Sequence, residues 1–165
     1  MHARIDSPAL TVPGALEHLQ GLAEAIRQAG IPETTLYLVQ LRASQINGCS
    51  ICVDIHTREL RMTGESDARI FLVGAWRESP YYSDAERAAL ALTEAATRLA
   101  DRPDAVSDEL WAEVAEHYDE AQLGALVLAI AAINTWNRIN ALTRQISGEW
   151  IGKWLASTAA ANTAA

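Results

Sequence analysis

The sequence predicts an all-α fold in a single domain that spans residues 1–165, with loose tails at 1–11 and 157–165. Three observations favour this fold. Apolar residues recur at i, i+3 and i+4 along several segments, the spacing that places them on one face of a helix. Helix-capping residues stand at the starts of those segments, and glycine or proline follows their ends. No segment alternates apolar and polar residues with the β-branched enrichment of a strand.

Two helices are expected before the only two cysteines of the chain. Pro13 and Pro32 each stand where a helix begins, since proline suits the first helical turn. The first helix carries an apolar stripe and ends at Gly30. The second ends at the turn dipeptide Asn47-Gly48, which delivers the chain to the cysteines.

The cysteine helix is expected to begin at or just before Cys49, to run to about Met62 and to stop at Gly64. A further helix, capped by Ser66, continues to Trp76. The proline that follows it then breaks the helical pattern.

Capping residues mark the next two helices. Ser83 and Glu86 form a capping box for a helix that continues to about Ala100. Ser107 caps a shorter helix that runs to about Tyr118.

The longest helix is expected from Glu120 to about Ile146, where Gly148 closes it. A short tail helix follows, with an apolar stripe of Trp150, Ile151, Trp154 and Leu155. A helix this short is not stable alone, so we expect it to dock on its own domain or on a neighbouring subunit. The chain therefore reads as a bundle of about seven to eight helices.

Composition excludes several classes of protein. A formal net charge of -8, with basic residues scattered among acids, argues against nucleic-acid binding. No apolar run is long enough to span a membrane, and no signal peptide is visible behind Met1, so a cytoplasmic location is expected. In the cytoplasm a Cys-x-x-Cys motif is more often catalytic than structural.

Cys49, Cys52 and His56 carry the strongest chemical signal. At 100° per residue the three side chains fall within about 60° of one another on one helix face. Cys49 would lie in the first turn, where unpaired backbone N–H groups and the helix dipole favour a thiolate. His56 lies one turn beyond Cys52, so its imidazole can exchange a proton with that sulfur.

Three other roles for the cysteines remain open beside redox chemistry. Buried cysteines can act as small hydrophobic side chains. A structural zinc site would need a fourth ligand from His2, His18 or His117, and the chain has no second cysteine pair. A structural disulfide would close too small a loop to constrain the unfolded chain much. Redox use of the pair is the preferred hypothesis, with no metal and no cofactor.

The segment from Leu41 through Cys49 and Cys52 to Thr57 closely resembles the alkyl hydroperoxidase D-like branch of the carboxymuconolactone decarboxylase family. The segments 76–78, 83–94 and 134–138 are also similar to that branch. The resemblance implies an all-α bundle with the Cys-x-x-Cys at the N-terminus of a central helix. It further implies assembly into trimers or hexamers, and a dithiol peroxidase recycled by a thiol reductant such as a dihydrolipoyl protein or a thioredoxin-like protein.

The resemblance also implies a role for each residue of the motif. Cys52 matches the cysteine that attacks the peroxide and becomes the sulfenic acid. Cys49 matches the partner that donates a proton, closes the Cys49–Cys52 disulfide and faces the reductant. His56 matches the histidine of the proton relay. The expected substrate is a small-molecule peroxide, and no membrane partner is expected.

One position departs from the family pattern. The family relay includes a glutamate twelve residues before the first cysteine, where this chain has Tyr37. A phenol with a pKa near 10 donates a hydrogen bond but is no base at neutral pH. Either another carboxylate substitutes or the activity is altered. Glu94, on a helix that the family places near the site, is the first candidate, with a buried structural acid as its competing role. Tyr37 is the other possible relay residue, with a core position as its competing role.

A second function follows from the same motif. With Cys49 exposed and the relay glutamate missing, the chain could be a disulfide reductase or adaptor that passes electrons to a partner peroxidase. A non-catalytic helical interaction domain is a third possibility, and it would require that neither cysteine reacts with a thiol reagent.

Overall fold

The computed structural model describes residues 2–101, 103–148 and 151–152 of the chain. Over these residues the fold is all-α, as the sequence predicts, with eight α-helices, two 3₁₀ helices and no strand. No helix in the described part is both long and apolar enough to cross a membrane. In chain order the elements are α1 (Pro8–Thr11), α2 (Ala15–Gln28), α3 (Glu33–Asn47), α4 (Ser50–Met62), α5 (Asp67–Leu72), η1 (Val73–Glu78), α6 (Asp84–Thr97), η2 (Leu99–Asp101), α7 (Asp108–Ala115) and α8 (Glu120–Thr143).

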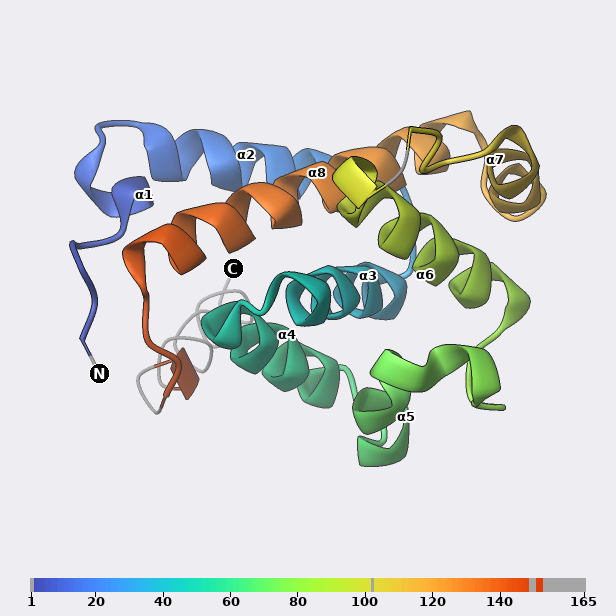
Figure 1. Ribbon diagram of the computed structural model, residues 1–165, viewed down its shortest axis with the longest axis horizontal. Coiled ribbons are helices and arrows are strands. Elements are labelled where there is room, and N and C mark those ends of the chain that lie inside the picture. The colour runs from blue at the N-terminus through green and yellow to red at the C-terminus, as the bar shows by residue number, and fades with distance from the viewer. Residues whose placement is uncertain (1, 102, 149–150, 153–165) are drawn as a thin grey trace.

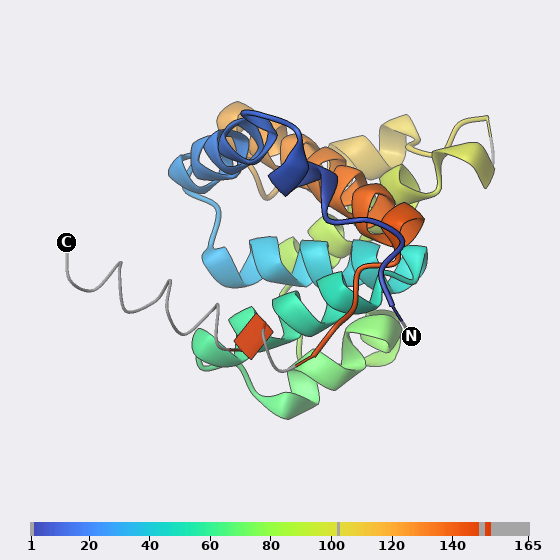
Figure 2. The same ribbon diagram turned by 90° about the vertical axis from the view of Figure 1, so that its left-hand side faces the viewer.

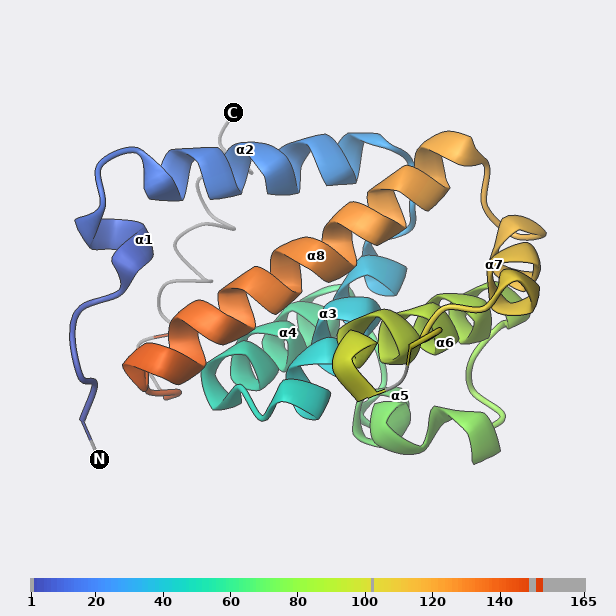
Figure 3. The ribbon, with the colours of Figure 1, turned by 45° about the horizontal axis from the view of Figure 1, so that its top comes forward.

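Helix α3 lies at the centre of the bundle and packs against α4, α6 and α8. Helices α2 and α8 form a layer over α3 and α4, with α5 at the opposite side (Figure 1). Figure 2 shows the same two layers from the end, and Figure 3 shows α8 crossing obliquely over α3 and α4. The cysteine helix α4 thus begins where α3 ends and where the last turns of α8 pass over it.

The core consists of three clusters of buried side chains. The first lies between α2, α3, α6, α7 and α8, and the second between α3, α4, α5 and α6. The third surrounds the two cysteines and is built from Ala43, Ile51, Ile133 and Ile151. The two cysteines therefore pack against apolar side chains that come from different parts of the sequence.

Capping residues fix the helix starts, as their positions in the sequence predict. Ser66 and Ser107 each accept a hydrogen bond from a backbone N–H in the first turn of α5 and α7. Ser83 and Glu86 form the expected reciprocal capping box of α6. A second capping box, between Asp119 and Gln122, opens α8. Each box satisfies two backbone donors that a helix start leaves without partners.

Several boundaries differ from the expected ones. The segment 66–76, expected as one helix, divides into α5 and η1, with a non-helical residue at Ala75. Helix α6 ends at Thr97, followed by the 3₁₀ helix η2, rather than at Ala100. Helix α8 ends at Thr143 because Arg144 adopts a left-handed conformation with φ of 55°.

The N-terminal segment, expected as a loose tail, is attached to the bundle. It contains α1, and Ala9 is buried. The backbone N–H of Arg4 donates to the carbonyl of Thr143, and the Gln145 amide donates to the carbonyl of Ile5. These bonds tie residues 4–5 to the end of α8. The expected tail helix at 150–155 lies outside the described residues, apart from Ile151 and Gly152, and so does the tail at 157–165.

Candidate active site

The two cysteines lie at the junction of α3 and α4. Gly48 ends α3 with a φ of 66°, a left-handed conformation that glycine adopts without steric cost. Cys49 follows in an extended conformation and is the N-cap of α4, so α4 begins where the sequence predicts. The first backbone hydrogen bond of α4 runs from Val53 to Cys49, so the amides of the first turn have no partner within the helix.

Cys49 and Cys52 form a disulfide, with 5.3 Å between their Cα atoms. Each cysteine is only 2% exposed. The expectation that Cys49 is exposed is therefore wrong for this state of the chain. The physical reason is that the N-cap packs against α8 and Ile151 rather than lying at the surface.

Ile151 packs against the cysteine pair. Ile151 is fully buried in the cysteine cluster, beside Ile51 and Ile133. The backbone N–H of Gly148 donates to Asp54 Oδ2 over 3.0 Å, which holds Gly148 beside α4. Ile151, one of the four stripe residues of the expected tail helix, thus packs on its own domain.

His56 lies one turn beyond Cys52 on α4 and has a carboxylate partner. Its Nδ1 is 2.7 Å from Glu59 Oε2, and both side chains are largely buried, 12% and 20% exposed. A carboxylate at Nδ1 favours the tautomer that carries a proton there and leaves Nε2 for chemistry. The sequence analysis missed Glu59, although its spacing of three residues from His56 on a helix is the signal that could have found it.

Tyr37 lies near this carboxylate. Its hydroxyl donates to Glu33 Oε1 over 2.7 Å. Burial, the hydrogen bond to Glu33 and the negative charge of Glu59 raise the pKa of Tyr37 above its usual range. Tyr37 is therefore no base, and the position where the family expects a glutamate adjoins Glu59, which already supplies a carboxylate to His56.

Glu94 is held elsewhere. Its carboxylate accepts hydrogen bonds from Arg42 Nε at 2.6 Å, from Trp76 Nε1 at 3.1 Å and from Arg77. Burial would raise the pKa of the Glu94 carboxyl, but hydrogen bonds from Arg77, Arg42 and Trp76 outweigh it and lower that pKa. No hydrogen bond or ion pair joins Glu94 to His56. Its surroundings favour the structural role.

A row of asparagines on α8 faces the end of α3. Asn47 Nδ2 donates to Asn134 Oδ1 at 3.0 Å and to Asn137 Oδ1 at 2.8 Å, and Asn137 Nδ2 donates to Ser44 Oγ at 3.0 Å. One turn further, Asn140 Nδ2 donates to Cys52 Sγ over 3.4 Å. Sequence reasoning missed Asn140, because nothing in the motif indicates which part of α8 passes over it.

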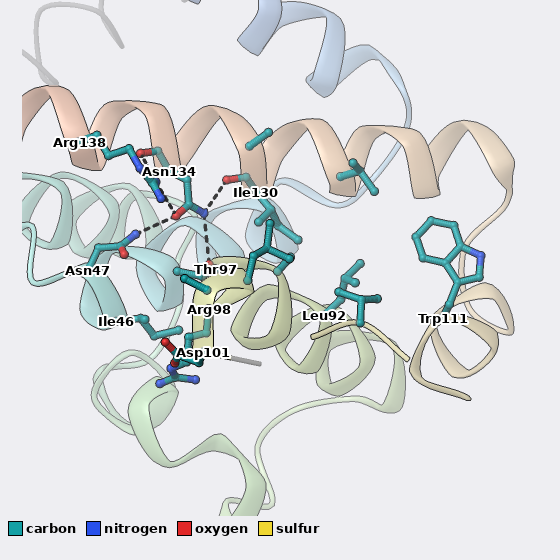
Figure 4. Close-up of a pocket in the computed structure, with 16 residues that line it drawn as sticks. Ile46, Asn47, Leu92, Thr97, Arg98, Asp101, Trp111, Ile130, Asn134 and Arg138 are labelled. Carbon is teal, nitrogen blue, oxygen red and sulfur yellow. Dashed lines mark hydrogen bonds between the residues drawn. The ribbon is translucent and has the colours of Figure 1, made fainter. Parts of the chain in front are cut away.

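A hollow of about 760 Å³ lies on the other side of this row, between α6, α7 and α8. Figure 4 shows Trp111 at one end and Asn134 at the other, where Asn134 bonds to Asn47 and Thr97. The cysteines are not among its lining residues. Among the described side chains, no three His, Cys, Asp or Glu residues gather closely enough to hold a metal ion.

The chain matches a known protein family. The model of the carboxymuconolactone decarboxylase family matches residues 13–95. The uncharacterized protein YdfG of Bacillus subtilis is 42% identical over 128 residues, which are 78% of this chain and 86% of YdfG.

Solved structures share the fold. A crystal structure from Agrobacterium tumefaciens, of a protein of unknown function proposed to be an AhpD antioxidant defence protein, is 35% identical with a TM-score of 0.82. The match covers 90% of this chain and 99% of that one. The debrominase Bmp8, 23% identical with a TM-score of 0.74 over 86% of this chain and 75% of its own, shows only that the fold is shared. On the family match and on these relatives, the chain belongs to the carboxymuconolactone decarboxylase family and is AhpD-like within it.

Proposed function

We propose that the protein is a thiol-dependent peroxidase that reduces hydroperoxides through the Cys49–Cys52 pair. One observation carries the proposal: a cysteine pair at the start of α4 that forms a disulfide, with a histidine–carboxylate pair one turn beyond it on the same helix. The family and its antioxidant-related relatives support a redox role. Beyond this general redox role, we propose that the substrate is a peroxide.

The reaction balances with these residues alone, a hydroperoxide and a dithiol. The Cys52 thiolate attacks one peroxide oxygen, the O–O bond breaks, and the other oxygen leaves as an alcohol or as water once it takes up a proton. Cys52 is then a sulfenic acid. The Cys49 thiol attacks it, the S–S bond forms and water leaves. A dithiol reductant finally returns two electrons and two protons to the pair.

The pair His56–Glu59 contributes more by protonating the leaving oxygen than by lowering the pKa of the attacking cysteine. Lowering a cysteine pKa from about 8.5 to about 6.5 raises its thiolate fraction at pH 7 roughly 25-fold. The weaker nucleophile loses about 8-fold if the slope for thiol exchange holds for peroxides, so only about threefold remains. The larger gain must come from protonating the leaving oxygen, and His56 Nε2 can do so with the proton that it takes from the Cys52 thiol.

The proposal includes partners that the chain itself does not identify. A dihydrolipoyl protein or a thioredoxin-like protein would supply electrons, as in the reducing environment of the cytoplasm. A homotrimer or homohexamer is the expected assembly. Because both cysteines are buried, the reductant must gain access to them, for example by displacement of Ile151.

Stoichiometry tests the proposal. The reduced protein is mixed with one equivalent of hydrogen peroxide or of cumene hydroperoxide, and free thiols are counted over time. We expect two thiols to disappear per peroxide consumed, and steady turnover once dihydrolipoamide or thioredoxin with its reductase is added. Reduced thiols that survive peroxide would overturn the proposal. If the protein then exchanged disulfides with thioredoxin, the adaptor function would take its place.

Glu59→Gln tests the relay. The amide keeps the shape of the side chain but removes the carboxylate that orients His56. We expect kcat/KM for peroxide to fall about 10- to 100-fold, less than the roughly 10²- to 10⁴-fold that a general acid or base contributes, because Glu59 acts through His56. Alkylation of the reduced protein by iodoacetamide, which needs no protonated leaving oxygen, should change much less.

The matched control is Glu33→Gln, which removes a carboxylate that contacts Tyr37 and not His56. It should leave peroxide kinetics near those of the wild type. Equal losses in both variants, or none in Glu59→Gln, would remove Glu59 from the relay.

A further inference from the structure

Asn140 lies against the sulfur of Cys52. Its Nδ2–H donates to Cys52 Sγ over 3.4 Å, and both side chains are buried. The two residues are 88 positions apart in sequence, so the contact depends on the tertiary fold. Within the described residues, no other side chain is seen to donate a hydrogen bond to either sulfur.

The neighbouring amides keep Asn140 in this place. Asn137, one turn before it on α8, is 1% exposed and bonds to both Asn47 and Ser44 of α3. A buried amide that loses such partners is costly, so these bonds oppose sliding or rotation of α8 over α3. By fixing the position of α8 relative to α3, these bonds also place Asn140 next to Cys52.

Apart from Asn140, the apolar side chains packed around Cys52 provide no group that stabilises a thiolate. Ala43, Ile133 and Trp136, from α3 and α8, and Ile151 have no ionisable group, and water is largely excluded. Among the described residues of α4, the ionisable side chains that follow the pair are Asp54, His56, Arg58 and Glu59. Burial alone disfavours a thiolate. A neutral N–H donor aimed at the sulfur opposes that effect.

Cys49 has a different source of stabilisation. As the N-cap of α4 it lies beside the amides of the first turn, which have no partner within the helix and favour a negative charge on its sulfur. Once the disulfide is reduced, the two sulfurs compete for one negative charge, since two adjacent thiolates repel each other. The helix amides favour Cys49, and the Asn140 amide favours Cys52.

We propose that Asn140 is a positioning residue of the dithiol centre: its amide holds Cys52 Sγ and makes Cys52, rather than Cys49, the anionic sulfur of the reduced pair. This deepens the proposed function, because it assigns the attacking cysteine from a contact in the fold. Its test uses thiol chemistry and needs no peroxide, so its failure is distinguishable from failure of the peroxidase function.

The test compares Asn140→Leu with Thr143→Val. Leucine keeps the size of the side chain and removes the donor. Thr143 is a buried polar residue of the same helix, and its hydroxyl donates to the carbonyl of Ile139 and accepts from the Gln145 amide. In a Cys49→Ser background, the thiolate absorbance of Cys52 is followed against pH. We expect the midpoint to rise by about one pH unit in Asn140→Leu, a tenfold loss of thiolate at a given pH below it, and to stay in place in Thr143→Val.

The second readout is the disulfide equilibrium of the intact pair against a dithiothreitol redox buffer. Removing the donor destabilises the reduced state, so Asn140→Leu should favour the disulfide by several-fold, up to about tenfold or about 30 mV more negative. Asn140→Asp, which keeps a polar side chain but places a negative charge near the sulfur, should shift both readouts in the same direction and guards against misfolding of the leucine variant. Unchanged readouts in Asn140→Leu and Asn140→Asp, or equal shifts in Thr143→Val, would overturn the proposal.

Discussion

Cys52→Ser is expected to abolish peroxide turnover, and Cys49→Ser is expected to retain a single turnover. Serine at position 52 has no sulfur to oxidise, and its hydroxyl is not ionised at neutral pH. Serine at position 49 leaves the attacking sulfur intact but cannot close the disulfide. Rapid mixing with one equivalent of peroxide, followed by trapping with dimedone and mass spectrometry, distinguishes the two variants.

Loss of the disulfide should change the stability of the two serine variants little. The two cysteines are three positions apart, so the bond closes a small loop and constrains the unfolded chain little. Both serine variants should therefore unfold at temperatures close to that of the reduced wild type. A dimedone adduct on Cys49 in Cys52→Ser, with turnover preserved, would reverse the assignment of the attacking cysteine.

Elements with local signals could be predicted from the sequence. Ser66, Ser83 and Ser107 mark helix starts because a cap depends on residues within one turn, which the sequence displays directly. The attachment of the N-terminal segment could not be predicted. It depends on hydrogen bonds between Arg4 and Thr143, residues at opposite ends of the chain.

The same division applies to the candidate site. Cys49 is the N-cap of α4, and Cys52 and His56 lie on that helix, as the spacing of the three residues in the sequence predicts. Glu59 also has a local signal, its spacing of three residues from His56 on one helix. The family pattern points instead to positions 37 and 94. Asn140 and the cover formed by Ile151 come from distant segments, and only their packing shows that Cys49 is buried.

Glu94→Gln is expected to lower the free energy of unfolding by about 3 kcal/mol, because it leaves the Arg42 guanidinium buried without its anionic partner. The side chains of Glu94 and Arg42 are 10% and 14% exposed, and their ion pair is shielded from solvent. Urea unfolding measures the change. Glu24→Gln is the control, because the ion pair of Glu24 with Arg27 lies in solvent and should contribute little.

The pH dependence of stability should follow from the same carboxylate. The pKa of Glu94 is lower in the folded chain than its ordinary value of 4.5, so the folded state binds fewer protons there than the unfolded state. Its contribution to stability is fully present above about pH 4.5 and is lost as pH falls through the lower folded pKa. Glu94→Gln should therefore show a flatter loss of stability in acid than the wild type, measured by thermal unfolding across that range.

Glu94 and Glu59 can then be separated by a crossed comparison. Glu94→Gln should lose stability while its folded fraction keeps the wild-type kcat/KM for peroxide, because its partners are Arg42, Trp76 and Arg77. Glu59→Gln should lose kcat/KM with a small change in stability, because the Glu59 carboxylate contacts His56 on its own helix. The opposite pattern would return the relay to Glu94, and it would mean that peroxide turnover does not depend on the carboxylate at His56 Nδ1.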